Sequence, residues 1–209
     1  MADLFLDLDG TLIDPKPGIT GSVIAALNRL DLPAPDADAL EWVIGPPLIE
    51  SFRTLGAPDP SAALALYREA YAAGGLFECR IYDGIPEALE KLRASGHRLH
   101  LATSKPLVYA ERITAHLWLD RLLDSQFGTD LAGTLNDKRD LLAHALQTLG
   151  KSGGVMIGDR RFDIAAARGN GLAALAVSWG YGDAGEWAAA DAICASPPLL
   201  TDAVAGLLG

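Results

Sequence analysis

The stretch LFLDLDGT, residues 4–11, decides the fold of this chain. Its first three residues, Leu4 to Leu6, are typical of a short buried strand, and Gly10 permits the chain to turn directly after it. Residues two apart on an extended backbone project to the same side, so we expect the carboxylates of Asp7 and Asp9 to face one crevice. In open parallel α/β sheets, ligands bind at the carboxyl ends of the strands. The sequence therefore predicts a functional site where this strand ends.

Two carboxylates in one crevice suit phosphoryl chemistry. Asp7 can attack a phosphorus atom, while Asp9 can protonate the leaving oxygen and later activate a water molecule. This division replaces one difficult displacement by two easier ones. An isolated Asp-Gly pair is explained equally well as an ordinary turn, so the rest of the chain has to decide between the two interpretations.

The chain beyond Gly84 alternates short apolar runs with amphipathic segments, as is typical of a parallel sheet covered by helices. Helices are expected at 85–95, 107–117 and 137–149, and strands at 99–102, 125–129, 155–157, 173–177 and 192–195. The predicted fold class is therefore α/β, with a Rossmann-like parallel sheet as its core.

A helical insert interrupts this alternation before Gly84, where helical patterns follow one another and no convincing strand occurs. Pro15 and Pro17 mark one border and Gly74-Gly75 the other, as expected for linkers that act as a hinge. We expect the insert to move as a lid that excludes water once substrate binds. The predicted domains are a catalytic core, 1–14 and 81–209, and the inserted helical domain, 15–80.

A second acidic pair follows the strand predicted at 155–157, in the segment GDRRFD at 158–163. Magnesium takes hard oxygen ligands and typically combines one or two carboxylates with waters and a substrate phosphate oxygen. Asp7 and Asp159 are therefore predicted metal ligands. Asp163 is explained equally well by direct ligation and as a helix N-terminal acid that complements the helix dipole.

Polar residues also follow the strand predicted at 99–102. Thr103, Ser104 and Lys105 bring hydroxyl groups, backbone N–H groups and a cation to the start of a predicted helix, which suits phosphate binding. Serine and threonine are also ordinary helix N-caps, so this signal is weak by itself.

A lysine is needed to offset the charge of the nucleophile and the transferring phosphoryl group. Lys151 precedes the strand predicted at 155–157, which puts it at the opposite edge of the sheet. Lys138 begins a predicted helix at the correct edge, where a cation is unfavourable unless another group recruits it. Lys138 is therefore the favoured candidate, and Lys105 is expected to contact substrate or phosphate.

The composition narrows the partners of this chain. Half of its 209 residues are hydrophobic and 21% are charged, as expected for a folded core. A formal net charge of −10 opposes broad contact with nucleic acid or anionic lipid. The two cysteines are too few for a disulfide framework, and neither a membrane span nor a secretion leader is expected. We expect a cytoplasmic monomer or homodimer that binds a small phosphorylated substrate.

The tryptophans are interpreted as core residues: Trp42, Trp118, Trp179 and Trp187.

Taken together, these segments resemble the haloacid dehalogenase-like superfamily. The resemblance rests on four elements in order along the chain: DLDGTL at 7–12, LATSK at 101–105, Lys138, and GDRRFD at 158–163. It spans most of the chain, and the branch it resembles most is that of the phosphoglycolate phosphatases. By this resemblance the helical insert is the cap domain of the superfamily.

The resemblance implies a role for each matched residue. Asp7 is then the nucleophile, Asp9 the acid/base whose backbone carbonyl also binds Mg²⁺, Thr103 the phosphate-binding hydroxyl, Lys138 the neutralising lysine and Asp159 a metal ligand. Further contacts to phosphate or metal are expected from Gly10, Thr11, Ser104, Lys105 and Asp163.

An acid at the position of Asp9 separates phosphatases and phosphomutases of the superfamily from dehalogenases, which lack it. Two departures from the pattern occur: Ser104 stands where Asn is common, and Arg139 follows Lys138 where many relatives have Pro. The predicted function is a Mg²⁺-dependent phosphomonoesterase for a small metabolite, such as phosphoglycolate or a nucleoside monophosphate. The alternative is a phosphosugar mutase. A non-catalytic phosphometabolite sensor is disfavoured because all the catalytic groups are retained.

Overall fold

The computed structural model describes residues 1–132 and 134–209, which form two compact units. The first unit combines Met1–Ile13 with Ile81–Gly209, and the second is Asp14–Arg80. None of the described helices is both long enough and apolar enough to cross a membrane.

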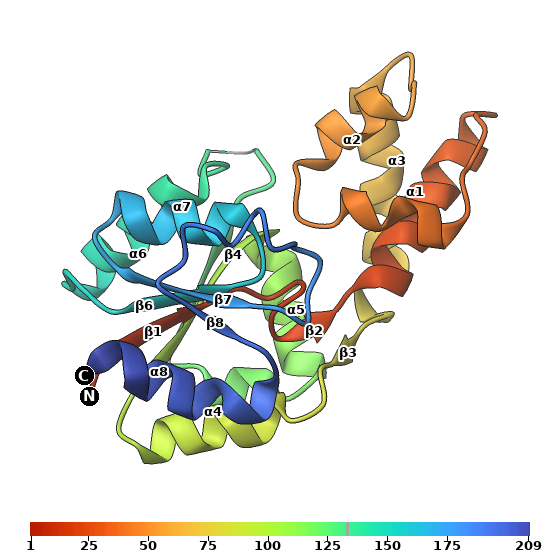
Figure 1. Ribbon diagram of the computed structural model, residues 1–209. Helices are drawn as coiled ribbons and strands as arrows, with labels where there is room; N and C mark the ends of the chain where they lie inside the picture. The colour runs from red at the N-terminus through yellow and green to blue at the C-terminus, as the bar shows by residue number, and fades with distance from the viewer. Residues whose placement is uncertain (133) are drawn as a thin grey trace. The chain divides into compact units, whose positions relative to one another are not determined.

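The first unit is built on a sheet of six parallel strands (Figure 1). In spatial order these are β5 (Ser125–Thr129), β4 (Arg98–Pro106), β1 (Asp3–Leu6), β6 (Val155–Gly158), β7 (Ala173–Val177) and β8 (Ala192–Cys194). The central strand β1 has Leu6 level with Leu101 of β4 and with Ile157 of β6. The segments that follow β4, β1 and β6 therefore leave the same edge of the sheet side by side.

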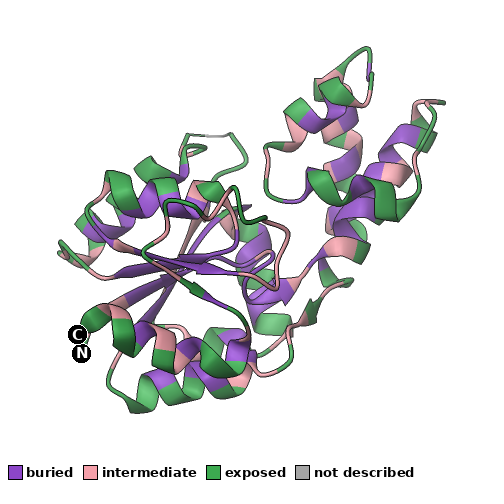
Figure 2. Cartoon of the chain, in the orientation of Figure 1, coloured by how far each residue is buried: buried purple, intermediate pink, exposed green. Residues whose placement is uncertain are grey.

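Helices cover both faces of this sheet, which confirms the α/β class (Figure 1). On one face lie α6 (Lys138–Leu149) and α7 (Arg161–Gly169), on the other lie α4 (Ile85–Ala94) and α8 (Leu200–Leu208), and α5 (Leu107–His116) packs against β4 and β5. Figure 2 shows that the strands are largely buried, whereas the helices expose their outer faces. The described part of the unit also contains the short 3₁₀ helices η3 (Leu119–Leu122) and η4 (Pro197–Leu199).

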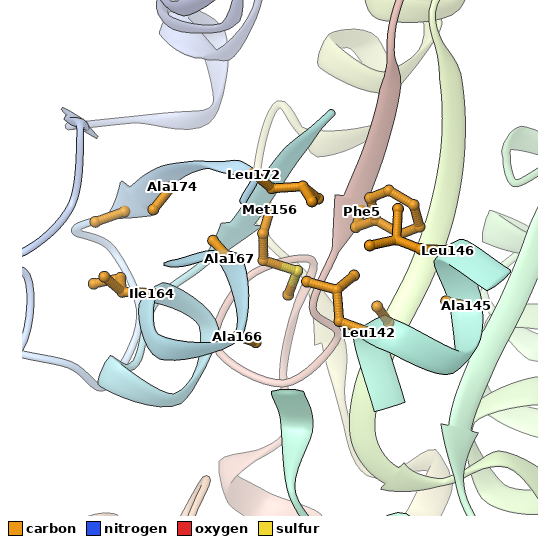
Figure 3. Close-up of a cluster of buried hydrophobic side chains, with 12 residues drawn as sticks. Phe5, Leu142, Ala145, Leu146, Met156, Ile164, Ala166, Ala167, Leu172 and Ala174 are labelled. Atoms are coloured by element: carbon orange, nitrogen blue, oxygen red, sulfur yellow. The ribbon is translucent and has the colours of Figure 1, made fainter. Parts of the chain in front are cut away.

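A cluster of buried apolar side chains joins the sheet to α6 and α7 (Figure 3). Phe5 of β1 and Met156 of β6 are both fully enclosed, and Leu142 of α6 packs with them. From α7, the small side chains of Ala166 and Ala167 enter the same cluster. Because protein interiors are close-packed, this cluster fixes the spacing of β1 and β6, and with it the spacing of the acidic residues that follow them.

The second unit is helical, as expected. It consists of α1 (Lys16–Arg29), η1 (Ala37–Val43), α2 (Leu48–Thr54), α3 (Pro60–Ala73) and η2 (Gly75–Phe77). Helix α1 packs against α3 and η1, and the rings of Tyr67 and Tyr71 stack along α3 with centroids 5.3 Å apart. A Cβ atom on Gly18 would lie 1.9 Å from the carbonyl oxygen of Gly75, so only glycine permits this close approach of the backbones.

The structure differs from the sequence analysis in several elements. Strands β2 (Ile13–Asp14) and β3 (Arg80–Ile81) pair as a two-stranded sheet, but two residues are too short to produce a recognisable alternation. Helix α8 was not predicted, and a helix at the position of α7 was considered only through the alternative explanation of Asp163 as a helix N-terminal acid. Residues Thr103 to Pro106, which were expected to open a helix, belong to β4, whose pairing with β5 shifts register between Thr103 and Pro106.

The interpretation of all four tryptophans as core residues was wrong for Trp42 and Trp118, whereas Trp179 and Trp187 are partly buried and Trp187 packs against the core cluster. Trp42 is 42% exposed and Trp118 is 62% exposed. The guanidinium group of Arg121 lies 3.8 Å above the Trp118 ring, so this ring rests under a cation instead of in the core.

Candidate active site

Acidic residues converge at the edge of the sheet where β1 and β6 end. Asp7, Asp159 and Asp163 are all buried, and each offers a carboxylate oxygen within 4.8 Å of the others. The backbone N–H of Asp7 still donates to the carbonyl of Ile157 at 2.9 Å, so β6 holds the start of the turn. Strand geometry thus brings together residues about 150 positions apart in the sequence.

The turn after β1 depends on Gly10. This residue has φ +79°, a left-handed conformation that glycine adopts without steric cost. A Cβ atom on Gly10 would lie 2.2 Å from Oδ2 of Asp159. Its N–H donates to the carbonyl of Ile13 at 2.9 Å, and the hydroxyl of Thr11 donates to Oδ1 of Asp159 at 3.4 Å. The turn therefore packs directly on the second acidic segment.

Each carboxylate of the first pair has its own lysine. Nζ of Lys138 lies 2.8 Å from Oδ1 of Asp7, and Nζ of Lys105 lies 2.9 Å from Oδ2 of Asp9. Both lysine side chains are about 95% buried, at 4% and 5% exposure. Lys138 is the first residue of α6, and the carboxylates that contact it there offset the unfavourable helix dipole.

The electrostatics keep Lys138 charged. Burial alone would lower its pKa, but the charges of Asp163 and Asp7 outweigh burial and raise the pKa above its ordinary value. For Asp9, burial raises the pKa; Lys105 opposes this effect, and the charge of Asp7 adds to it. The two aspartates of the DLDG turn thus have different surroundings despite being two residues apart.

The net negative charge of the site favours binding of a divalent cation. Four carboxylates, those of Asp7, Asp9, Asp159 and Asp163, face two ammonium groups, a formal excess of two negative charges. Burial, together with the charges of Asp163 and Asp7, raises the pKa of Asp159 to about 8. Hard carboxylate oxygens in a buried cluster of net negative charge are the donor set that Mg²⁺ prefers. The residues present therefore fit this ion.

Asp163 is held by the protein through both of its oxygens. Oδ1 lies 2.5 Å from Nζ of Lys138, and Oδ2 accepts a hydrogen bond from the N–H of Arg160 at 3.0 Å. The second contact caps the start of α7, as expected for a helix N-terminal acid. A Cβ atom on Gly158 would lie 2.0 Å from Cγ of Asp163, so the glycine before the acidic pair makes room for this carboxylate. Direct ligation of a metal by Asp163 stays a prediction.

The three predicted phosphate-binding residues at the end of β4 differ in burial and in their contacts. Thr103 is buried, and its hydroxyl oxygen accepts a hydrogen bond from the N–H of Lys105 at 3.2 Å. Ser104 is exposed, and its carbonyl accepts from the hydroxyl of Thr129 at 3.1 Å. Lys105, which was expected to contact substrate or phosphate, lies against Asp9.

A fourth segment at this edge was missed by the sequence analysis. After β7, the N–H of Tyr181 donates to Oδ2 of Asp159 at 2.7 Å, and Nε1 of Trp187 donates to the carbonyl of Asp159 at 2.7 Å. Nε1 of Trp179 donates to the carbonyl of Thr11 at 3.0 Å. The signal was present in the sequence, because the segment SWGYG at 178–182 also follows a predicted parallel strand.

Comparisons with known proteins agree with this architecture. Over 88% of its length, the chain is 44% identical to a 5′-nucleotidase of Pseudomonas aeruginosa, 86% of which is covered. It is 38% identical over 87% of its length to the tyrosine-protein kinase PtkA of Mycobacterium tuberculosis, of which 63% is covered. It is 30% identical over 96% of its length to a plasmid phosphoglycolate phosphatase of Cupriavidus necator, of which 93% is covered.

A solved structure is similar along almost its whole length. The crystal structure of a predicted phosphatase from Clostridium acetobutylicum superimposes with a TM-score of 0.93 at 36% identity, and 99% of each chain is covered. Residues 4–177 match the family described as haloacid dehalogenase-like hydrolase, and this range includes all four of the motifs that suggested the resemblance. The chain therefore belongs to the haloacid dehalogenase-like hydrolase family.

Proposed function

We propose that this chain is a Mg²⁺-dependent phosphomonoesterase that carries the phosphoryl group on Asp7. One observation supports this above all others: Asp7, which is buried, and Asp9, which is partly buried, lie in one turn, and each faces its own buried lysine. A simple Asp-Gly turn at a protein surface requires neither the burial nor the lysines. Relatives named as phosphatases support the same reaction class.

In the first step, a carboxylate oxygen of Asp7 attacks phosphorus. The new bond joins this oxygen to phosphorus, the ester bond to the alcohol breaks, and Asp9 gives its proton to the departing oxygen. In the second step, Asp9 takes a proton from a water molecule that attacks the same phosphorus. The bond between phosphorus and Asp7 then breaks, inorganic phosphate leaves, and both aspartates return to their starting state.

The surroundings of the two aspartates suit these roles. The carboxyl of Asp9 is largely shielded from water and has a raised pKa, so it retains its proton closer to neutral pH, as a general acid must. Asp7 instead lies 2.8 Å from the ammonium group of Lys138, which places positive charge beside the carboxylate that would attack phosphorus. Lys138, with its positive charge secured by two carboxylates, offsets the negative charge of the incoming phosphoryl group.

Asp7 and Asp159, with the backbone carbonyl of Asp9, would hold Mg²⁺. The ion would supply charge neutralisation at the phosphoryl oxygens. Asp163 would orient Lys138 and cap α7, since both of its oxygens are engaged by the protein. Thr103 would bind phosphate through its hydroxyl group, with Ser104 beside it. Gly10 and Thr11 would shape the turn, because their N–H groups donate to the carbonyls of Ile13 and Leu8.

Among small phosphomonoesters, a nucleoside 5′-monophosphate is the first candidate substrate and phosphoglycolate the second, in the order of identity to the named relatives. Release of phosphate from a panel of both, before and after removal of metal by chelation, tests the proposal. We expect turnover with Mg²⁺, its loss after chelation and its recovery when Mg²⁺ is restored. Full turnover by metal-stripped enzyme would contradict the assignment of Asp7 and Asp159 as ligands.

Two other fates of the phosphoryl group are distinguishable. A phosphosugar mutase would return it to the sugar, so a hexose 1-phosphate would be isomerised and little phosphate released. The similarity to PtkA makes transfer to a tyrosine hydroxyl the second alternative. Transfer of the terminal phosphoryl group of ATP to a tyrosine peptide, without release of phosphate from monoesters, would favour a kinase over the phosphatase.

A further inference from the structure

The segment that follows β7 encloses Asp159 from two directions. Tyr181 donates its N–H to the carboxylate, and the indole N–H of Trp187 donates to the backbone carbonyl, both at 2.7 Å. The segment also lies close to the Asp159 backbone, because a Cβ atom on Gly182 would be 1.8 Å from the same carbonyl oxygen. One segment therefore fixes both the main chain and the side chain of this residue.

An ion pair holds Glu186, the residue that precedes Trp187. Nε of Arg160 lies 2.9 Å from Oε2 of Glu186, and a second guanidinium nitrogen donates to Oε1 at 3.0 Å. The N–H of Arg161 also donates to Oε2 of Glu186 at 2.9 Å. Both partners of the ion pair are largely shielded from water, at 12% and 15% exposure. A two-point contact between arginine and carboxylate fixes orientation as well as distance, so Trp187, the next residue, is held in place.

We propose that Trp187 is a positioning residue for the Asp159 carboxylate and that the Arg160–Glu186 ion pair holds it there. This inference rests on the proposed function, in which Asp159 binds Mg²⁺. Hydrogen-bond partners behind a metal ligand orient that ligand, and their loss typically lowers metal affinity roughly 10–100-fold. The sequence analysis interpreted this tryptophan as a core residue, but Trp187 is half-buried and uses its polar atom on the backbone of a predicted ligand.

The chain offers a matched control at the far end of the same segment. Arg168 donates to the carbonyl of Ala189 and lies 2.9 Å from a carboxylate oxygen of Asp191. Like Arg160, it ties α7 to the segment after β7. Unlike the Arg160–Glu186 pair, its contacts lie beyond the stretch that hydrogen-bonds to Asp159. Loss of Arg168 therefore reports on the general attachment of the segment.

The experiment measures Mg²⁺ binding without turnover. MgCl₂ is titrated calorimetrically into the full-length wild type and the Trp187→Phe, Glu186→Gln, Arg160→Met and Arg168→Met variants, and the melting temperature of each metal-free protein is recorded. We expect Trp187→Phe to raise the Kd for Mg²⁺ roughly tenfold or more. Glu186→Gln and Arg160→Met should act in the same direction, whereas Arg168→Met should bind as the wild type does. Activity should recover at saturating Mg²⁺, because the ligand is misplaced and not removed.

Wild-type affinity in Trp187→Phe would overturn the inference. So would an equal loss in Arg168→Met and Arg160→Met, because the segment would then act through general attachment. Should Arg160→Met fail to fold, Trp187→Phe and Glu186→Gln decide the matter by the same comparison. If the wild type itself binds no Mg²⁺, the proposed function fails, and the positioning role fails with it; this result is recognised without any variant.

Discussion

The two aspartates of the DLDG turn differ through what surrounds each of them. Asp7 lies at the end of β1 against Lys138, and Asp9 lies two residues later against Lys105. Sequence analysis anticipated the recruitment of Lys138 from its unfavourable place at a helix start. The partner of Lys105 could not be predicted, because a long side chain at the edge of a sheet reaches several groups.

Gly10 provides a test at the scale of a single residue. In a Gly10→Ala variant, the alanine would have to adopt the left-handed conformation of Gly10, which costs about 1–2 kcal/mol. Its Cβ atom would also collide with Asp159. Gly96→Ala is the matched control, since Gly96 has φ +83° and open space around it. We expect both variants to lose stability in urea unfolding, but only Gly10→Ala to lose Mg²⁺ binding. Equal effects of the two changes on both measurements would contradict the close packing at Gly10.

At the scale of elements, β1, β4 and β5 are tied together at the amino end of the sheet, away from the candidate site. Nε2 of His100 lies 3.0 Å from Oδ1 of Asp3, and Nδ1 lies 2.7 Å from the hydroxyl of Ser125. Lys151, which the sequence analysis expected at this edge, lies 3.4 Å from Oδ2 of Asp3. A paired polar network around the buried ring of His100 favours one strand order over others.

This network predicts a pH-dependent contribution to stability. Burial raises the pKa of Asp3, but hydrogen bonds from His100 and Lys151 outweigh burial and hold the pKa below its ordinary value. The unfolded chain then binds the proton more readily, so the contribution is present above the ordinary pKa, about 4, and is lost as pH falls through the folded value. We expect Asp3→Asn to lower the free energy of unfolding by about 1–2 kcal/mol at pH 7.

The measurement is urea unfolding of wild type and Asp3→Asn between pH 7 and the lowest pH at which both fold. The difference between them should shrink below about pH 4. Asp36→Asn, at an exposed position of the second unit, serves as the control and should change little at any pH. A difference between wild type and Asp3→Asn that stays constant with pH would contradict the role of the Asp3 charge.

Whether a helix or strand could be predicted from the sequence depends on its length and on its pattern of apolar residues. Five of the six strands in the described sheet follow apolar runs, β5 (SQFGT) being the exception, and because parallel strands end at one edge, the motifs could be gathered there from the sequence alone. Helix α7 was anticipated only through the alternative explanation of Asp163, because its first turn overlaps the GDRRFD motif, whose acidic residues were also explained as metal ligands. Strands β2 and β3 carry too few residues for any alternation.

At the scale of the whole molecule, the net charge of −10 opposes the approach of an anionic substrate. The site itself is nearly neutral once a divalent cation offsets its formal excess of two negative charges. Salt shortens the screening length from about 30 Å at 0.01 M to about 8 Å at 0.15 M ionic strength. We therefore expect kcat/KM for a phosphomonoester dianion to rise over this range at saturating Mg²⁺.

Steady-state kinetics in sodium chloride and in potassium acetate check this expectation, since an effect of screening is the same in both salts. A fall of kcat/KM with ionic strength would mean that the local positive charge of Lys105, Lys138 and the cation governs the encounter. The division into two compact units also belongs to this scale, and movement of the helical unit as a lid stays a prediction. The composition predicted that the overall electrostatic field of the protein is negative. Which charged side chains pair within the site could be known only from the folded structure.

The central claim is that Asp7 carries the phosphoryl group while Asp9 transfers protons. It is tested most directly by rapid mixing of two variants with p-nitrophenyl phosphate, whose leaving group departs without protonation. Asp7→Asn lacks the nucleophile, so neither a product burst nor phosphorylated enzyme should form. Asp9→Asn keeps the nucleophile but loses a positioned acid–base group, which contributes roughly 10²–10⁴-fold in rate.

In Asp9→Asn we expect a burst of at most about one nitrophenolate per active site, followed by slow turnover, because hydrolysis of the phosphorylated aspartate still needs a base. An alkyl phosphate, whose alkoxide leaves poorly, should give little burst in the same variant. A burst in Asp7→Asn and none in Asp9→Asn would reverse the two roles. Turnover like that of the wild type in both variants would contradict a covalent mechanism on this pair.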